Sequence, residues 1–211
     1  MKILYLESVS STQDYIKNLL KDKKIKVPYA VVSDIQTNGV GSRGNQWQGI
    51  KGNLFLSFAI TIKDLPSDLR LESSSIYFAY LLKETLFEFG SKVWLKWPND
   101  FYLDNLKLGG VICNIVNDTL ICGIGLNLVD SPNGFAKLDI EVSKEELLEK
   151  YFIKIKKDFP WKQVFSKYKL EFYKSKDFYT HGGDIKISLE DATLFSDGSI
   201  MINDERIYSL R

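Results

Sequence analysis

KWPNDFYLDNLKLGG, residues 96–110, is the stretch of sequence that decides the fold of this chain. Asp104-Asn105 lies between two apolar runs and predicts a two-residue hairpin turn. In a regular ladder Tyr102 then pairs with Lys107, and Asp100 shares one face with both. Ideal sheet geometry puts the Asp100 carboxylate about 7–8 Å from the Lys107 ammonium, so that a small anion could lie between or beyond them. Spacing alone equally allows an exposed ion pair that contributes about 0–1 kcal/mol.

The segments around this hairpin predict one core built from strands and helices. Apolar runs of strand length occupy residues 3–6, 29–34, 54–60, 93–96, 111–116 and 119–125. Apolar residues have helical spacing in four segments, which are 11–20, 76–89, 143–155 and 160–168. Residues 54–60 alternate too little to have a solvated face, so we expect that strand in the middle of the sheet. The hairpin 111–116 and 119–125 turns at Asn117-Asp118.

The pattern changes after about residue 178. Short strands are predicted at 184–189, 192–196, 199–203 and 206–210, and Asp197-Gly198 is a strong hairpin signal. We therefore expect a first domain at 1–178 and a small β-domain at 179–211. A β-domain of this size is too small to fold reliably alone, so it should dock on the first domain. His181 is interpreted as a boundary residue without a catalytic part.

The composition excludes several classes of protein. Of 211 residues, 45% are hydrophobic and 26% are charged, as in an ordinary globular protein, and the formal net charge of +1 argues against a dedicated nucleic-acid binder. No apolar run has the length of a signal peptide core or a membrane span. The two cysteines, Cys113 and Cys122, are predicted to face each other across the second hairpin as reduced core residues, not as a disulfide or metal site. We therefore expect a cytoplasmic protein.

A glycine-rich segment, Gly39-Val40-Gly41-Ser42-Arg43-Gly44, precedes the central strand. Such loops present backbone N–H groups to anions, and an arginine adds positive charge. The segment is neither a Walker loop nor a dinucleotide fingerprint, and a flexible surface connection is the alternative interpretation. Trp47 follows in a polar stretch with little core to join, so its ring could stack on a base.

These motifs occur in a defined order along the chain: Ser11-Thr12-Gln13; Gln36 followed by Gly39, Gly41, Arg43, Gly44 and Trp47; Lys96-Trp97-Pro98-Asn99-Asp100; Lys107-Leu108-Gly109-Gly110; and Gly123-Ile124-Gly125-Leu126-Asn127. The series closely resembles the biotin protein ligase family over nearly the whole chain. The resemblance begins at the catalytic domain, as in the monofunctional form without an N-terminal DNA-binding domain, so no DNA partner is expected.

The resemblance implies an α+β fold similar to class II aminoacyl-tRNA synthetases. Such a fold has a mixed, mostly antiparallel sheet flanked by helices, plus a small SH3-like β C-terminal domain. It also implies a two-step reaction. Biotin and ATP, with Mg²⁺, give biotinyl-5′-AMP, and the biotinyl group then passes to a lysine of a biotin carboxyl carrier protein. Family members are monomers or dimers, so a homodimer is possible.

The resemblance also assigns roles by position. The catalytic residues would be Lys107, Asp100 and Arg43. The biotin-binding residues would be Ser11, Thr12, Gln13, Gln36, Lys107, Gly109 and Gly110. The ATP- or adenylate-binding residues would be Gly39, Gly41, Ser42, Arg43, Gly44, Trp47, Asn99 and Asn127. No residue is assigned as a metal ligand.

One departure from the family pattern bears on retention of the adenylate. Family loops commonly read Gly-Arg-Gly-Arg-x-Gly, whereas Val40 and Ser42 occupy both arginine positions here. Either Arg43 reaches the same phosphate or the intermediate is held less tightly. The alternative functions are lipoate ligation or octanoyl transfer on the same fold, and a non-catalytic biotin-binding module. The tryptophan of Lys96–Asp100 and the lysine of the Lys107 motif favour biotin over lipoate, and the presence of Lys107 and Asp100 counts against a non-catalytic module.

Overall fold

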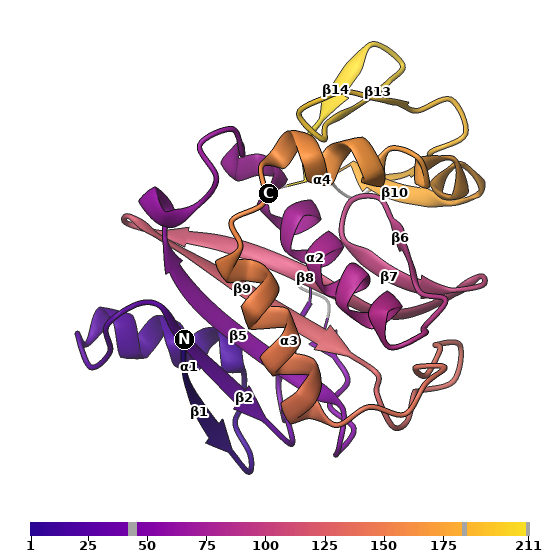
Figure 1. Ribbon diagram of the computed structural model, residues 1–211. Helices are drawn as coiled ribbons and strands as arrows, with labels where there is room; N and C mark the ends of the chain where they lie inside the picture. The colour runs from indigo at the N-terminus through magenta and orange to yellow at the C-terminus, as the bar shows by residue number, and fades with distance from the viewer. Residues whose placement is uncertain (42–45, 183–184, 210–211) are drawn as a thin grey trace.

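A seven-stranded sheet forms the centre of the computed structural model, which describes residues 1–41, 46–182 and 185–209 (Figure 1). Its strands, in spatial order, are β1 (Lys2–Leu6), β2 (Tyr29–Ser33), β5 (Leu54–Thr61), β9 (Thr119–Leu126), β8 (Leu106–Val116), β7 (Asp100–Leu103) and β6 (Trp94–Lys96). Only the β1–β2 pair in this sheet is parallel. The predicted mixed, mostly antiparallel sheet is confirmed, and β5 lies near its middle as expected.

Helices cover both faces of this sheet (Figure 1). The helices are α1 (Thr12–Lys21), α2 (Ser74–Glu88), α3 (Lys144–Lys156) and α4 (Trp161–Tyr168), with short 3₁₀ turns η2 (Ile62–Asp64), η3 (Leu71–Ser73) and η4 (Phe172–Asp177). Ser11 and Ser143 begin α1 and α3 as N-caps, because each hydroxyl accepts a hydrogen bond from the backbone N–H three residues later, at 3.2 Å. Gly90 follows α2 with φ +95°, a conformation that suits glycine at a helix end.

The alternation of side chains along the strands separates two layers of core. On β2, Ala30 and Val32 belong to the large cluster that contains α2 and α3, whereas Tyr29 and Val31 belong to a smaller cluster around Ile16 of α1. The same alternation holds for β5 and β9. The large apolar helix α2 therefore packs on one face of the sheet. Helix α1 packs on the other face and covers only part of it.

The two predicted hairpins have the expected turns. Tyr102 pairs with Lys107, Val116 pairs with Thr119, and Cys113 lies opposite Cys122. The register shifts between Phe101 and Tyr102, however, so β8 carries one extra residue. This β-bulge is absent from the regular ladder that the sequence suggested, and it re-aims the side chains beyond the turn.

The C-terminal region has shorter and more numerous strands than predicted. Strands β10 (Tyr179–Gly182) and β11 (Ile185–Ser188) form one pair, and β12 (Thr193–Leu194), β13 (Ile200–Ile202) and β14 (Glu205–Ile207) form a second sheet. Strand β10 was not predicted, because glycines 182 and 183 suggested a break between the two regions of the chain. Ile200 and Ile207 join the same apolar cluster as α2, so this region packs on the main sheet and helices as expected. The division at residues 178 and 179 remains a prediction.

A further small pair, β3 (Gly39–Val40) and β4 (Gln46–Trp47), flanks residues 42–45 of the glycine-rich segment, which lie outside the described residues. Across the described ranges, none of the helices combines the length and apolar character needed to cross a lipid bilayer.

Candidate functional site

A pocket opens on the face of the sheet that α1 leaves uncovered. With the space open to solvent included, it measures about 510 Å³. It gathers predicted site residues from four of the five motifs that the sequence carries. These are Ser11, Thr12, Gln13, Gln36, Gly41, Trp47, Asn99, Asp100, Lys107 and Gly110.

Small residues on three neighbouring strands form the floor of this pocket. Ser57 pairs with Gly123, and Gly125 pairs with Gly110, so two rows across the sheet carry little or no side chain. A Cβ atom on Gly123 would lie 2.3 Å from the Gln13 side-chain oxygen, and one on Gly125 would lie 2.7 Å from the indole nitrogen of Trp47. The two glycines therefore let the side chains of Gln13 and Trp47, which line the pocket, lie directly on the floor.

Buried hydroxyls and amides make a connected network beside this floor. Both the backbone N–H and the hydroxyl of Thr12 donate to Oε1 of Gln36, at 2.7 and 3.0 Å. The Ser57 hydroxyl lies 2.9 Å from that of Thr12 and donates to Oε1 of Gln13 at 3.0 Å. Nε2 of Gln13 donates in turn to Asn114 at 3.1 Å. Such a network can exchange partners with a polar ligand group.

Asp100 stands between two lysines at one end of the pocket. Its carboxylate oxygens lie 2.7 Å from Nζ of Lys107 and 3.3 Å from Nζ of Lys96. Burial acts to raise the pKa of Asp100, but the two ammonium groups outweigh it and hold the pKa below the ordinary aspartate value. Two cations and one carboxylate leave a net positive charge, so this end of the pocket suits an anion.

The direct contact between Asp100 and Lys107 corrects the separation of about 7–8 Å that a regular ladder predicted. Because of the bulge, Asp100 pairs with Gly110, while Lys107 remains opposite Tyr102. Lys107 and Gly110 are three residues apart, yet both line the pocket. No small anion can lie between the two charged groups, and a ligand must approach the pair from the pocket.

Trp47 closes one side of the site. Its ring meets Phe135 edge-on, with centroids 6.2 Å apart, and Nζ of Lys107 lies 6.0 Å from the Trp47 ring centroid. Its indole nitrogen is buried and has no hydrogen-bond partner among the described residues. Trp47 also lines a further pocket, together with Asn127, Pro132 and Phe135. The ring thus borders two pockets, as an aromatic platform for a base could.

Three other predicted residues lie near the pocket without lining it. A Cβ atom on Gly109 would lie 2.4 Å from the Gly125 carbonyl oxygen, so this glycine permits close packing of β8 on β9. Gly39 pairs with Trp47, and a Cβ atom on Gly39 would lie 2.5 Å from the backbone carbonyl oxygen of Trp47. The Asn127 amide accepts from Asn53 at 3.2 Å and donates to Ala136 at 3.1 Å. Ser42, Arg43 and Gly44 lie outside the described residues.

Several pocket residues were missed by the sequence argument. Ser57 is fully buried and joins Thr12 to Gln13, and a lone serine inside the apolar run 54–60 was its one visible signal. Asn114 has the same kind of signal on β8. Lys96 belongs to a recognised motif, but nothing local indicated that it would pair with Asp100.

A second pocket adjoins the first at Asn99 and Asp100. Lys96, Asn114 and His181 also line it, and His181 comes from β10 of the C-terminal region. The structure therefore places His181 at a pocket that shares Asp100, although the sequence suggested only a boundary residue. Among the described residues, no three His, Cys, Asp or Glu side chains form a group that could hold a metal ion.

Trp97, which belongs to the motif that favoured biotin in the sequence, is not among the residues that line the first pocket. Its side chain is fully buried, and its indole N–H donates to the Gly198 carbonyl at 2.9 Å. The residue therefore contacts the C-terminal region.

Comparisons with known proteins agree with this geometry. The model of the biotin/lipoate A/B protein ligase family matches residues 5–127. The chain is 32% identical over 136 residues to biotin–protein ligase 2 of Arabidopsis thaliana, a match that spans 60% of this chain and 40% of that protein. It is 29% identical over 133 residues to the bifunctional ligase/repressor BirA of Escherichia coli K12, again 60% and 40%. The chain thus spans less than half the length of these curated relatives.

Two solved structures resemble the whole chain. The biotin acetyl coenzyme A carboxylase synthetase of Helicobacter pylori, with bound biotinylated ATP, is 40% identical over 98% of this chain and 99% of that one, with a TM-score of 0.94. The biotin protein ligase of Aquifex aeolicus, in complex with biotin and ATP, is 24% identical over 100% and 96% of the two chains, with a TM-score of 0.79. The second likeness shows the fold alone.

Proposed function

Because the chain belongs to the biotin/lipoate A/B protein ligase family, we propose that it is an ATP-dependent biotin protein ligase. It activates biotin as biotinyl-5′-AMP and transfers the biotinyl group to a lysine of a biotin carboxyl carrier protein. The observation that carries this proposal is the pocket in which the Thr12–Gln13–Ser57 network lies beside the Lys107–Asp100 pair. The similarity to a synthetase with bound biotinylated ATP supports it.

The polar network supports biotin over lipoate as the substrate. The ureido group of biotin carries two N–H donors and one carbonyl acceptor, and the network offers both acceptors and donors in a buried setting. The dithiolane end of lipoate has no comparable groups, so it would leave those amides and hydroxyls without new partners. Ser11, Thr12, Gln13 and Gln36 would hold the ureido end, and Gly110 and Lys107 would approach the carboxylate end.

The positive charge around Asp100 supports the first step. A biotin carboxylate that attacks the α-phosphate of ATP brings two anions together, and fixed cations offset their repulsion and stabilise the charge of the transition state. Lys107 lines the first pocket beside Asp100, which borders both pockets, and would contact both anions. Lys96 pairs with the same carboxylate from the adjoining pocket and would face the departing pyrophosphate.

The nucleotide would lie beside Trp47 and the glycine-rich segment. The ring of Trp47 would pack on adenine, with Asn99 and Asn127 nearby, and the backbone of Gly39–Gly44 would close over the adenylate. Arg43 would supply the guanidinium that Val40 and Ser42 do not. Asp100, the one acidic residue lining either pocket in the described part of the chain, is already paired with two lysines. We therefore propose that Mg²⁺ enters with the triphosphate, whose oxygens are its usual ligands.

The second step would use Asp100. Its lowered pKa keeps the carboxylate ionised at neutral pH, so it can accept a hydrogen bond from the incoming carrier amine and orient it toward the mixed anhydride. The amine nitrogen forms a bond to the biotinyl carbon, AMP leaves with the anhydride oxygen, and the amine loses a proton.

Incubation with biotin, ATP, Mg²⁺ and a carrier domain, followed by mass spectrometry of the target lysine, tests this function. Biotinyl-lysine is the expected product. Modification with lipoate or an octanoyl donor in place of biotin would assign the chain to the other branch of the family. Binding of biotin without biotin-dependent ATP–pyrophosphate exchange would show a non-catalytic binding module.

Two further properties are part of the proposal. The cysteines Cys113 and Cys122 are free although they face each other across β8 and β9, which supports a reducing compartment such as the cytoplasm. A homodimer is possible because β1 forms an edge of the main sheet.

A further inference from the structure

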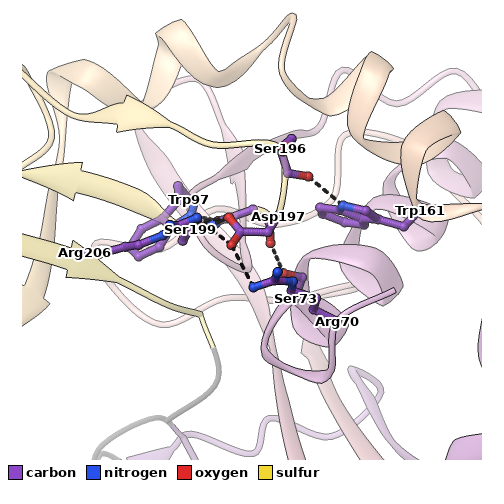
Figure 2. Close-up of polar contacts among 9 residues, drawn as sticks. Arg70, Ser73, Trp97, Trp161, Ser196, Asp197, Ser199 and Arg206 are labelled. Atoms are coloured by element: carbon purple, nitrogen blue, oxygen red, sulfur yellow. Dashed lines mark hydrogen bonds and ion pairs between the residues drawn. The ribbon is translucent and has the colours of Figure 1, made fainter. Parts of the chain in front are cut away.

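We propose that Trp97 is a positioning residue, which couples the C-terminal turn 195–199 to the Lys96–Asp100 pair of the candidate site. Trp97 follows Lys96 directly and precedes Asp100 by three residues, yet it is not among the residues that line either pocket. Its side chain instead reaches the turn 195–199 of the C-terminal region (Figure 2). The kinetic part of the test below rests on the proposed function, and the spectroscopic part does not.

The first step of the argument concerns the turn itself, which is firmly held. The Asp197 carboxylate accepts from the backbone and hydroxyl of Ser199, at 3.1 and 2.6 Å, and from Arg206 at 2.7 Å. Arg70 approaches the same carboxylate at 3.4 Å, and the Ser73 hydroxyl donates to the Asp197 carbonyl (Figure 2). The turn is therefore bound both to its own sheet and to the residues that precede α2.

Gly198 lets this turn approach the main domain closely. Its φ of +81° lies in the left-handed region, and an added Cβ atom would meet Ile76 and Ser73 at 3.0 Å. Asp197-Gly198 is thus more than the hairpin signal seen in the sequence, because it brings two backbone carbonyls within reach of tryptophans of the main domain. Trp161 donates to Ser196 at 2.7 Å, and Trp97 donates to Gly198 at 2.9 Å (Figure 2).

The second step concerns how Trp97 is fixed. Its backbone N–H donates to the Ser175 hydroxyl of η4 at 2.9 Å, so both ends of the residue are bonded to segments that follow residue 170. Beside it, Phe178 packs against Trp94 of β6 and Tyr102 of β7, with centroids 5.4 and 5.0 Å apart. Ser175 and Phe178, together with the turn 195–199, therefore hold the short strand β6 and the loop after it.

The third step concerns what this loop carries. Lys96 and Asp100 are directly paired across β6 and β7, and the chain between them consists of Trp97, Pro98 and Asn99. Pro98 and Asn99 line the second pocket. Since the loop is so short, a displacement of Trp97 moves at least one member of the Lys96–Asp100 pair. Displacements near 1 Å at a reacting site can change rates by about 100-fold.

Trp97→Phe tests the proposal, because it removes the indole N–H and keeps an aromatic ring in the core. We expect kcat for biotin-dependent ATP–pyrophosphate exchange to fall about 10- to 100-fold, with KM for biotin changed by less than about threefold. Trp161→Phe is the matched control. It removes the same kind of hydrogen bond to the same turn, but it touches neither Lys96 nor Asp100, and its kcat should stay within about twofold of the wild-type value.

A second readout measures geometry at Asp100 without turnover. Carbon-13 NMR titration of the Asp100 carboxyl reports its pKa, which Lys96 and Lys107 lower and burial raises. Tyr102 also interacts with Asp100, and burial and Asp100 raise the pKa of Tyr102, while His181 lines the second pocket together with Asp100. In Trp97→Phe the Lys96 pairing weakens, so the Asp100 pKa should rise toward the ordinary value. It should be unchanged in Trp161→Phe.

Ser175→Ala supplies an independent variant if Trp97→Phe does not fold, since it removes the acceptor of the Trp97 backbone N–H and should shift kcat and the Asp100 pKa in the same directions. Equal effects of Trp97→Phe and Trp161→Phe on both readouts would overturn the coupling and leave Trp97 as a core residue. Absence of exchange in the wild-type protein would instead refute the proposed function, and the titration would still decide the role of Trp97.

Discussion

Replacing Lys107 with alanine separates catalysis from folding. The Lys107 side chain is 30% exposed, and Asp100 keeps its contact with Lys96 at 3.3 Å when Lys107 is removed. The stability cost is therefore that of a partly exposed ion pair, about 0–1 kcal/mol, because no buried charge is left alone. For a chain of this size that cost corresponds to a fall in Tm of no more than about 4 °C.

The expected cost in catalysis is much larger. Removal of one positioned group that stabilises transition-state charge typically lowers kcat by about 10²- to 10³-fold, or roughly 2.7–4 kcal/mol. Biotin-dependent ATP–pyrophosphate exchange measures this step, and thermal unfolding measures the fold. The control is Lys154→Ala, which breaks the ion pair with Glu88 at 2.5 Å on α3, away from the site. Exchange by folded Lys107→Ala within about threefold of wild type would refute the role given to Lys107.

Three other changes test the rest of the site. Asp100→Asn should remove one contribution to acid unfolding. The pKa of Asp100 is lowered in the folded state, so the ionised carboxylate stabilises the protein above about pH 4, and this stabilisation is lost as the pH falls through the lowered pKa. Tm measured against pH in the wild type and the variant will show the difference. Ser57→Ala removes the hydroxyl that donates to Gln13, and the unpaired buried partner should weaken biotin binding by about 1–3 kcal/mol in calorimetry, with KM for ATP unchanged. Gly123→Ala puts a methyl group 2.3 Å from the Gln13 oxygen, so biotin affinity should fall more than about tenfold, and unchanged affinity would contradict the proposed floor.

Much of the fold was predictable because its signals are local. Asp104-Asn105 and Asn117-Asp118 each set a two-residue turn, and the pairings of Leu103 with Leu106 and Val116 with Thr119 follow from the turns alone. The bulge between Phe101 and Tyr102 was not predictable in this way. It leaves Leu108 without a partner on β7, and the turn residues Asp104-Asn105 do not encode that extra residue.

The residues of the candidate site were likewise predictable where the signal is local and not predictable where it depends on a distant partner. Residues in recognisable motifs, such as Gln36 and Lys107, could be assigned to the pocket from sequence. Ser57 and Asn114 could not, because each acts through a hydrogen bond to Gln13, which is 44 or 101 residues away in the chain. The direction of Trp97 was also hidden, since its partner carbonyl at Gly198 lies 101 residues further on.

The hydroxyl and amide chain from Gln36 through Thr12 to Gln13 has a thermodynamic consequence for ligand capture. These side chains bond to one another without a guest, so the network does not need a ligand to hold it in place. If the pocket takes biotin as proposed, its ureido group would exchange partners with side chains that are already bonded, and less configurational entropy would be lost on association.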